Sequence, residues 1–245
     1  MKIATIRSTR GFLLVSSLII GTLQSPLAVA DDDDDVRYRL MPYLWASGMD
    51  VEIGPPGNTT QADVAFSDFL DFIDIGAAFI FEARGDRWLV ATNVLWVQLG
   101  EEFDLPTGTT EVEIDEFLIE TFVGYRPSGW ENLWLVGGMR YFELDTTIDF
   151  ANINDVRSSQ DFVDPYVGVM WEPRRGNWEY ILQADVGGGI DADFAWAFTL
   201  GAAYHFNNRY ALVGGYRFID IDFEDDEFVF DGTMEGIQIG LMITF

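Results

Sequence analysis

Alternation of bulky apolar residues with smaller or polar ones, at a period of two, runs through this chain from Val36 to its last residue. At the C-terminus, bulky apolar residues occupy every second position from Ile237 to Phe245, and residues such as Gln238 and Gly240 lie between them. Period two places successive side chains on opposite faces of an extended strand. The repetition of this pattern predicts an all-β protein, and only one short stretch follows a helical period instead.

Turn residues divide the alternating sequence into ten expected strands. We place them at residues 37–48, 74–84, 87–100, 111–126, 133–146, 162–173, 177–188, 193–206, 209–222 and 233–245. Short connections alternate with long, acidic ones at 49–73, 101–110, 147–161, 189–192 and 223–232. This alternation is typical of bacterial outer-membrane barrels, and each strand is long enough to cross a bilayer when tilted. We expect a closed antiparallel up-and-down transmembrane β-barrel of about ten strands, with eight as the alternative and both termini in the periplasm.

Each expected strand has one bulky face and one face of small, polar or charged residues. In the strand at 193–206, for example, Trp196 and Phe198 alternate with Ala197 and Thr199. In a soluble barrel the bulky face would fill the interior, with the small and charged residues facing water. In a membrane barrel the bulky face contacts lipid and the other face lines the lumen.

The positions of the aromatic residues favour the membrane barrel. Those expected at the membrane interfaces are Trp88, Trp171, Trp178, Tyr210 and Phe245 near the short connections, and Trp96 and Trp196 toward the long ones. Two aromatic bands flanking an aliphatic middle are typical of bilayer interfaces. Backbone groups in lipid must be paired, so we expect the last strand to pair with the first and close the barrel.

The N-terminus has the pattern of an export signal. A basic opening precedes an apolar core, and the small residues Ala28 and Ala30 follow it. We expect residues 1–30 to be a cleaved signal peptide, residues 31–36 an acidic lead, and residues 37–245 a single barrel domain.

The composition limits the chemistry and the partners. The chain has 14 Lys and Arg and 41 Asp and Glu, and three of the basic residues lie in the expected signal peptide. Such an excess of acid repels phosphate backbones, so nucleic acid is not an expected partner. The chain has no cysteine, so neither a disulfide nor a thiolate metal site can form.

Six motifs carry a resemblance to a known group of proteins. They are PYLWASG (42–48), FSDFLD (66–71), FEARGDRW (81–88), DPYVGVMW (164–171), DVGGGI (185–190) and GYRFIDIDFE (215–224). Together they resemble a widespread, largely uncharacterised family of small Gram-negative outer-membrane β-barrel proteins, over nearly the whole mature chain. The resemblance implies the outer membrane as location, with lipid and lipopolysaccharide around the barrel. A terminal aromatic residue is also typical of proteins passed to the outer-membrane insertion machinery. The resemblance implies no reaction, ligand or cofactor.

On the expected register, ionisable residues gather on the face that lines the lumen. They are Arg37, Arg39, Glu82, Arg84, Glu116, Glu120, Arg126, Arg140, Asp164, Glu179, Asp185, His205 and Arg217. One interpretation is a narrow passive pore with charge selectivity, and this is the function we expect first. The alternative is a plugged structural or surface-interaction barrel, because arginine and carboxylate side chains also form networks that fill small barrels.

One stretch in the first long connection breaks the strand pattern. Its apolar residues recur at helical spacing, with Ser67 as a possible cap; they are Phe66, Phe69, Leu70 and Ile73. We expect either a short helix across the barrel mouth or a loop that covers the rim.

The other long connections are acidic, as at Glu101 and Asp226. On a lipopolysaccharide surface these carboxylates would repel their surroundings unless divalent cations bridge them, and weak bridging is therefore a hypothesis. The acidic run at 31–35 lacks the spacing of a calcium loop. No resident metal or cofactor is expected.

An enzyme is the most distant alternative, because some outer-membrane barrels are proteases or lipid-modifying enzymes. His205 is the only histidine, and it lies beside a short connection rather than near the outer rim. Its expected role is to form a hydrogen bond in the lumen, and no catalytic residue is assigned.

Overall fold

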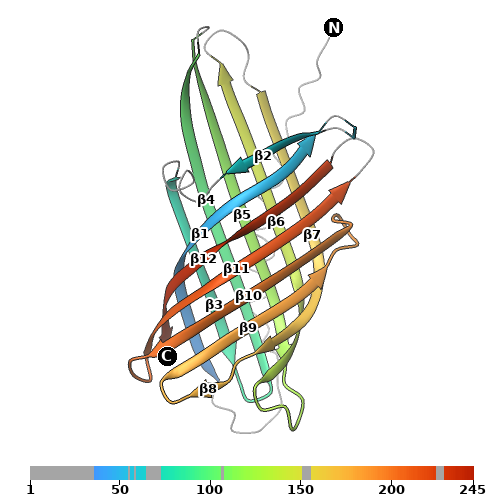
Figure 1. Cartoon of the computed structure of the whole chain (residues 1–245). Helices are drawn as coiled ribbons and strands as arrows, with labels where there is room; N and C mark the ends of the chain where they lie inside the picture. Colours follow the sequence, from blue (N-terminus) through green and yellow to red (C-terminus); the bar gives the residue numbers. More distant parts are fainter. Residues whose placement is uncertain are drawn as a thin grey trace, which may run out of the picture. The chain divides into compact units, whose positions relative to one another are not determined.

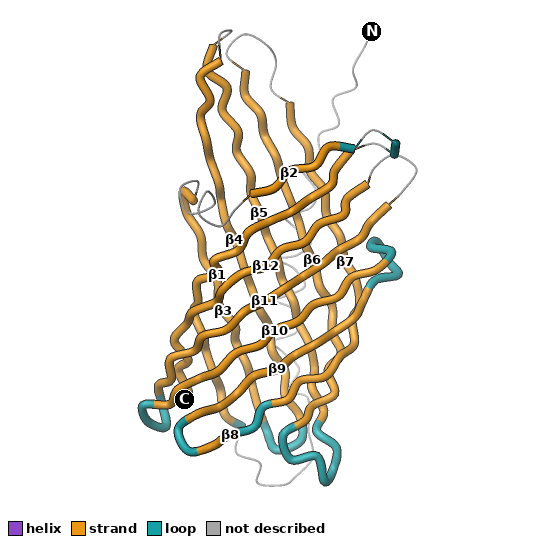
Figure 2. The backbone as a smooth tube through the Cα atoms, viewed as in Figure 1, coloured by secondary structure: helices purple, strands orange, loops and turns teal. Residues whose placement is uncertain are grey.

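The computed structural model describes residues 36–245 except 55, 58, 65–72, 106–107, 151–155 and 225–228. Ten long strands in this part of the chain form an antiparallel barrel (Figures 1 and 2). They are β1 (Arg37–Gly54), β3 (Ile73–Arg84), β4 (Trp88–Leu105), β5 (Gly108–Tyr125), β6 (Leu133–Phe150), β7 (Val156–Trp171), β9 (Trp178–Gly187), β10 (Phe194–His205), β11 (Tyr210–Glu224) and β12 (Val229–Thr244). Two short strands, β2 (Thr60–Val64) and β8 (Arg174–Arg175), pair with β1 and β9.

The ten long strands form a closed circle, in which each strand pairs with a neighbour on either side. The last strand pairs with the first, from Arg39 opposite Thr244 to Gly54 opposite Val229. Backbone bonds between Tyr38 and Phe245 extend this seam to the C-terminus, with N–O distances of 3.0 and 2.9 Å. Strand β9 pairs with both β7 and β10, which completes the circle. Every long strand thus has a partner on both sides, as closure of a sheet in lipid requires, and this confirms the ten-strand expectation.

The described residues contain no helix that is long and apolar enough to cross a membrane.

The barrel has two different ends. At one, which we call the short-turn end, β3 and β4, β5 and β6, β7 and β9, and β10 and β11 are joined by short turns. The opposite end, which we call the loop end, carries the β9–β10 turn and the ends of β4, β5, β6 and β7, which stand highest in Figure 1.

At the loop end, the strands are longer than the sequence pattern predicted. Most of the expected loop at 101–110 belongs to β4 and β5, and β6 continues to Phe150. The expected connections at 49–73 and 223–232 likewise contain strand, at the ends of β1, β3, β11 and β12 and in β2. The sequence pattern ended these strands early because their outward residues there are acidic rather than apolar, which removes the alternation.

The expected helix in the first long connection lies almost wholly outside the described residues, including Phe66, Phe69 and Leu70. Ile73, which we assigned to that helix or rim loop, is instead the first residue of β3.

The two faces of the sheet have the predicted orientation. All seven aromatic residues assigned to the membrane interfaces are exposed on the outside, from Trp96 at 37% to Phe245 at 61%. Aliphatic residues such as Leu44, Val167 and Ile239 are exposed between them. The buried set includes the charged residues Glu120, Arg140 and Arg217, which face the lumen. Hydrocarbon therefore meets the bulky face, and the charges are enclosed.

Glycines on the inner face allow close approach of neighbouring strands. A Cβ atom on Gly168 would lie 2.2 Å from the carbonyl oxygen of Ala184, and one on Gly236 would lie 1.8 Å from that of Ala46. Any larger residue at these positions would force β7 away from β9, or β12 away from β1. These glycines therefore permit the tight curvature of the barrel wall.

Candidate functional site: the barrel lumen

A chain of alternating charges crosses the lumen at the short-turn end, and we call it the floor layer. Its members, in order of contact, are Glu172, Arg84, Glu82, Arg39, Glu179 and His205. The two guanidinium groups bridge the three carboxylates at N–O distances from 2.7 to 3.8 Å. His205 Nε2 lies 2.9 Å from Glu179 Oε2 at the end of the chain. The members come from β1, β3, β9, β10 and the turn after β7, so the layer links two separate parts of the barrel wall across the lumen.

Trp134 fills the rest of the floor. It is 1% exposed, and the guanidinium carbons of Arg84 and Arg126 lie 5.1 and 4.7 Å from its ring centroid. Arg126 also donates to the backbone carbonyls of Glu131 and Asp86. A desolvated cation over an indole is a favourable contact, and here it closes the lumen beside the ion pairs.

A second network, which we call the middle layer, is centred on Glu120 of β5. Its carboxylate accepts from Asn93 Nδ2 at 2.9 Å, from Arg140 Nε at 2.8 Å and from Arg217 Nη2. Arg140 also donates to Asp185 at 2.9 Å. Two guanidinium groups thus face two carboxylates, so the layer is neutral as a unit. Buried charges are tolerated only when they are paired in this way.

Aromatic rings stack above the charges of the middle layer. The guanidinium carbon of Arg140 lies 5.1 Å from the Tyr166 ring centroid, and that of Arg217 lies 5.6 Å from the Trp45 ring centroid. Tyr43 donates its hydroxyl to Asn93 Oδ1 at 2.8 Å. The rings fill space that the charged groups leave, and they hold the guanidinium planes in place.

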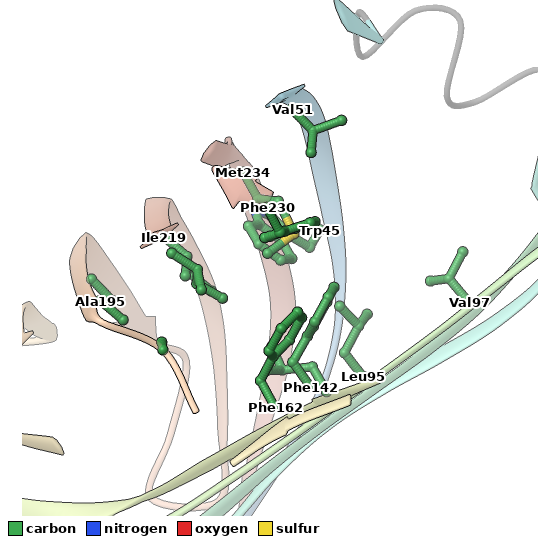
Figure 3. Close-up of a cluster of buried hydrophobic side chains, with 14 of the residues drawn as sticks. Trp45, Val51, Leu95, Val97, Phe142, Phe162, Ala195, Ile219, Phe230 and Met234 are labelled. Atoms are coloured by element: carbon green, nitrogen blue, oxygen red, sulfur yellow. The ribbon is translucent and has the colours of Figure 1, made fainter. Parts of the chain in front are cut away.

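Toward the loop end, a hydrophobic plug of aromatic and aliphatic side chains fills the lumen; we call it the aromatic layer (Figure 3). The ring centroids of Phe142 and Phe162 are 6.2 Å apart, and those of Phe162 and Phe230 are 5.4 Å apart. Leu118 and Ile219 beside them are 0% exposed. These residues come from β5, β6, β7, β11 and β12, so the layer spans the barrel from wall to wall.

The β9–β10 turn folds inward onto the aromatic layer. The Asp164 carboxylate accepts from the backbone N–H groups of Ile190, Asp191 and Ala192, at 3.2, 3.1 and 3.0 Å. Ala192 is 1% exposed and belongs to the same hydrophobic cluster as Phe142. The turn begins with Gly188 and Gly189 at φ values of 114° and 92°, which favour glycine. Asp164 is therefore a buried anchor for a turn that narrows the lumen.

Between the floor and middle layers lies a chamber of about 130 Å³. Its walls combine the thioethers of Met41, Met170 and Met242 with the polar side chains of Gln183 and Thr199. A volume of this size holds several water molecules, since each needs roughly 10–15 Å³ of such space.

The structure places most of the predicted lumen residues inside the barrel. Ten are buried: Glu82, Arg84, Glu116, Glu120, Arg140, Asp164, Glu179, Asp185, His205 and Arg217. Arg39 and Arg126 are half-buried, and Arg37 is exposed at the end of β1, where the barrel wall stops. Arg37 therefore does not line an enclosed lumen.

The sequence interpretation missed the aromatic layer. Phe142, Phe162 and Phe230 share strand parity with the lumen charges, for example Phe142 with Arg140, and that parity was the available signal. We assigned the aromatic residues of the bulky face to lipid and gave no role to those that share the lumen face. Within the described residues, no group of three or more His, Asp or Glu residues is arranged to hold a metal ion.

The fold is that of bacterial outer-membrane barrels. The outer-membrane protease OmpT from Escherichia coli has a TM-score of 0.55 and 9% identity, over 88% of this chain and 99% of that one. Ail, the attachment invasion locus protein of Yersinia pestis, has a TM-score of 0.41 and 9% identity, over 86% and 98%. Neisserial surface protein A has a TM-score of 0.35 and 10% identity, over 85% and 97%. No family model and no curated protein matches the sequence. At 9% identity the likeness to OmpT shows the fold and nothing about activity.

Proposed function

We propose that this chain, a β-barrel of the outer membrane, is closed at rest and acts through its surfaces rather than by transport through its lumen. The observation that carries this proposal is the aromatic layer, in which Phe142 and Phe230 are each 1% exposed. Hydrophobic constrictions in channels block conduction by excluding water, and a layer of close-packed rings is an extreme form of such a constriction.

The two ionic layers oppose transport independently. An ion crossing the middle layer would have to separate Glu120 from Arg140, and one crossing the floor would have to separate Glu179 from Arg39. Each separation leaves buried charges without partners, which costs several kcal/mol. Three successive barriers therefore support a closed barrel.

A narrow passive pore, the function expected first from the sequence, is the second candidate. The observation that favours it is the chamber of about 130 Å³, which lies between the two ionic layers and carries Gln183 and Thr199 on its wall. In this alternative the chamber is a stretch of a water path, and the layers above and below it open transiently. Solute and selectivity would then follow from the two ionic layers.

We further propose that the barrel is not an enzyme. The one histidine of the sequence, His205, is 6% exposed and bound to Glu179 within the floor layer. A group held in this way is not presented to a substrate at the outer rim. The arrangement supports a structural role for His205.

Thiol accessibility tests the closed barrel, because the chain has no cysteine of its own. Thr199→Cys places a thiol on the chamber wall, and Asp231→Cys places one on the exposed loop end. With folded protein in vesicles, we expect a small charged thiol reagent to modify the Asp231→Cys variant and to leave the Thr199→Cys variant unmodified until it is unfolded. Comparable modification rates at the two positions would reject the closed barrel and support the pore.

A further inference from the structure

The exposed charges of the barrel are sorted by sign between its two ends. Five exposed arginines lie at the short-turn end, and we call them the arginine ring: Arg37, Arg87, Arg174, Arg175 and Arg209. The exposed acids at that end are Asp86 and Glu131, together with the C-terminal carboxylate. At the loop end, the charged residues whose side chains the structure describes as exposed are acids: Asp50, Glu113, Asp161, Asp191, Asp193, Asp222, Glu224, Asp231 and Glu235. The side chain of Arg157 on β7 is not among those described.

The arginine ring is not neutralised within the described part of the protein. The arginine–carboxylate ion pairs found there use Arg39, Arg84, Arg140 and Arg217, all of which face the lumen. None of these pairs uses a member of the ring. At this end the five exposed arginines outnumber the two exposed acids and the C-terminal carboxylate. An excess of exposed cations that form no ion pair creates a field that attracts an anionic partner.

Members of the ring lie beside the aromatic residues that mark the membrane interface. Arg87 directly precedes Trp88, and Arg175 is paired with Trp178 across the β8–β9 ladder. The guanidinium carbon of Arg209 lies 5.5 Å from the ring centroid of Tyr210. Exposed Trp and Tyr side chains sit at the level of the lipid headgroups, so these guanidinium groups are at the level of the phosphates.

We propose that the arginine ring binds the phosphate groups of anionic phospholipids, of the phosphatidylglycerol class, in the leaflet that the short-turn end contacts. Guanidinium groups bind phosphate oxygens at two points, and the adjacent rings pack against the glycerol and upper acyl region. The exposed carboxylates of the loop end form no such site for a phosphate group. The barrel therefore has a preferred lipid on one side only, and that preference helps to fix its orientation.

Lipid competition tests this proposal on the folded full-length barrel. Protein in mixed micelles with equal phosphatidylglycerol and phosphatidylcholine is analysed by native mass spectrometry, and retained lipids are counted by class. We expect the wild type to retain phosphatidylglycerol preferentially. In the variant Arg87→Gln/Arg174→Gln/Arg175→Gln/Arg209→Gln, the ratio of retained phosphatidylglycerol to retained phosphatidylcholine should fall by about tenfold or more. Each basic residue near a membrane surface adds to the attraction for anionic lipid.

Four controls make the result decisive. Asp222→Asn/Asp231→Asn at the loop end should leave the lipid preference unchanged, and heat-dependent gel mobility should show that every variant is folded. The variant Arg87→Lys/Arg174→Lys/Arg175→Lys/Arg209→Lys should keep part of the preference for phosphatidylglycerol, because the charge remains but the two-point geometry is lost. Inorganic phosphate at matched ionic strength should not displace the lipid. Equal retention of both lipids by the wild type, an unchanged preference in the glutamine variant, or displacement by free phosphate would each overturn the proposal.

Discussion

Glu120 is the residue on which the middle layer depends. It is 5% exposed and accepts from two arginines and Asn93. Replacement by alanine leaves Arg140 with one carboxylate partner and Arg217 with no partner among the described acids. Loss of one partner from a buried ion pair typically costs about 3–5 kcal/mol.

We therefore expect Glu120→Ala to lower the free energy of unfolding by about 3–5 kcal/mol in urea titrations of protein folded into vesicles. Glu113→Ala, on the same strand but exposed, is the matched control and should change it by about 0.5 kcal/mol or less. Equal effects of the two substitutions would show that the middle layer contributes nothing specific.

Asp231 shows how the acids of the loop end act on one another. It lies on β12 beyond the exposed hydrophobic residues Ile237 to Leu241, outside the membrane. Partial burial, followed by the nearby carboxylates of Asp220 and Asp222, raises the pKa of Asp231 above its usual 3.8. Because the folded-state pKa is the higher one, protonation favours the fold, and stability is lost as pH rises from 3.8 through the raised value.

Asp231→Asn removes this repulsion. We expect the variant to unfold at a higher urea concentration than the wild type at about pH 7, and at the same concentration at about pH 3. A wild type that is more stable than the variant at neutral pH would show that the Asp231 carboxylate forms a favourable contact instead.

At the scale of elements, the β9–β10 turn is held in place by one side chain. Asp164 on β7 accepts three backbone N–H groups of the turn, and Ala192 is inserted into the aromatic layer as a result. An unsatisfied buried donor costs about 1–3 kcal/mol, so removal of this acceptor favours release of the turn.

We expect Asp164→Ala to expose the turn without unfolding the barrel. A cysteine in place of Ala192 reports on this, because a thiol there should be protected in the otherwise wild-type protein and labelled quickly in the Asp164→Ala background. Asp161→Ala, an exposed acid on the same strand, is the control and should leave the cysteine protected. Protection that survives the loss of Asp164 would mean that packing alone holds the turn.

The strands themselves were predictable where they contact lipid. Between the two aromatic bands, parity alone assigned Glu82, Arg140 and Arg217 to the lumen. Beyond the loop-end band, the outward side chains become acidic, as at Asp145 and Asp222, and the alternation that marks a strand disappears. The contacts inside the lumen were not predictable, because Arg217 and Glu120 are 97 residues apart in sequence. A strand pattern indicates that both point inward, but it does not indicate that they meet.

At the scale of the whole molecule, the barrel is acidic at its loop end and basic at its short-turn end. We propose that the loop end faces lipopolysaccharide and that divalent cations offset the acid repulsion there. In vesicles containing lipopolysaccharide, chelation of Mg²⁺ should lower the thermal unfolding midpoint, and restoring Mg²⁺ should reverse the loss while sodium at equal ionic strength should not. A midpoint that does not respond to chelation would reject cation bridging.

The central claim also belongs to the scale of the whole molecule. It is that three layers of side chains close the lumen. Purified wild-type protein reconstituted in a planar bilayer tests it directly, with insertion verified by the heat-dependent gel mobility of the same preparation. The layered interior predicts a silent membrane, with no unitary conductance steps. Reproducible unitary steps that grow in number with added protein would contradict it and would show that the layers leave a continuous water path.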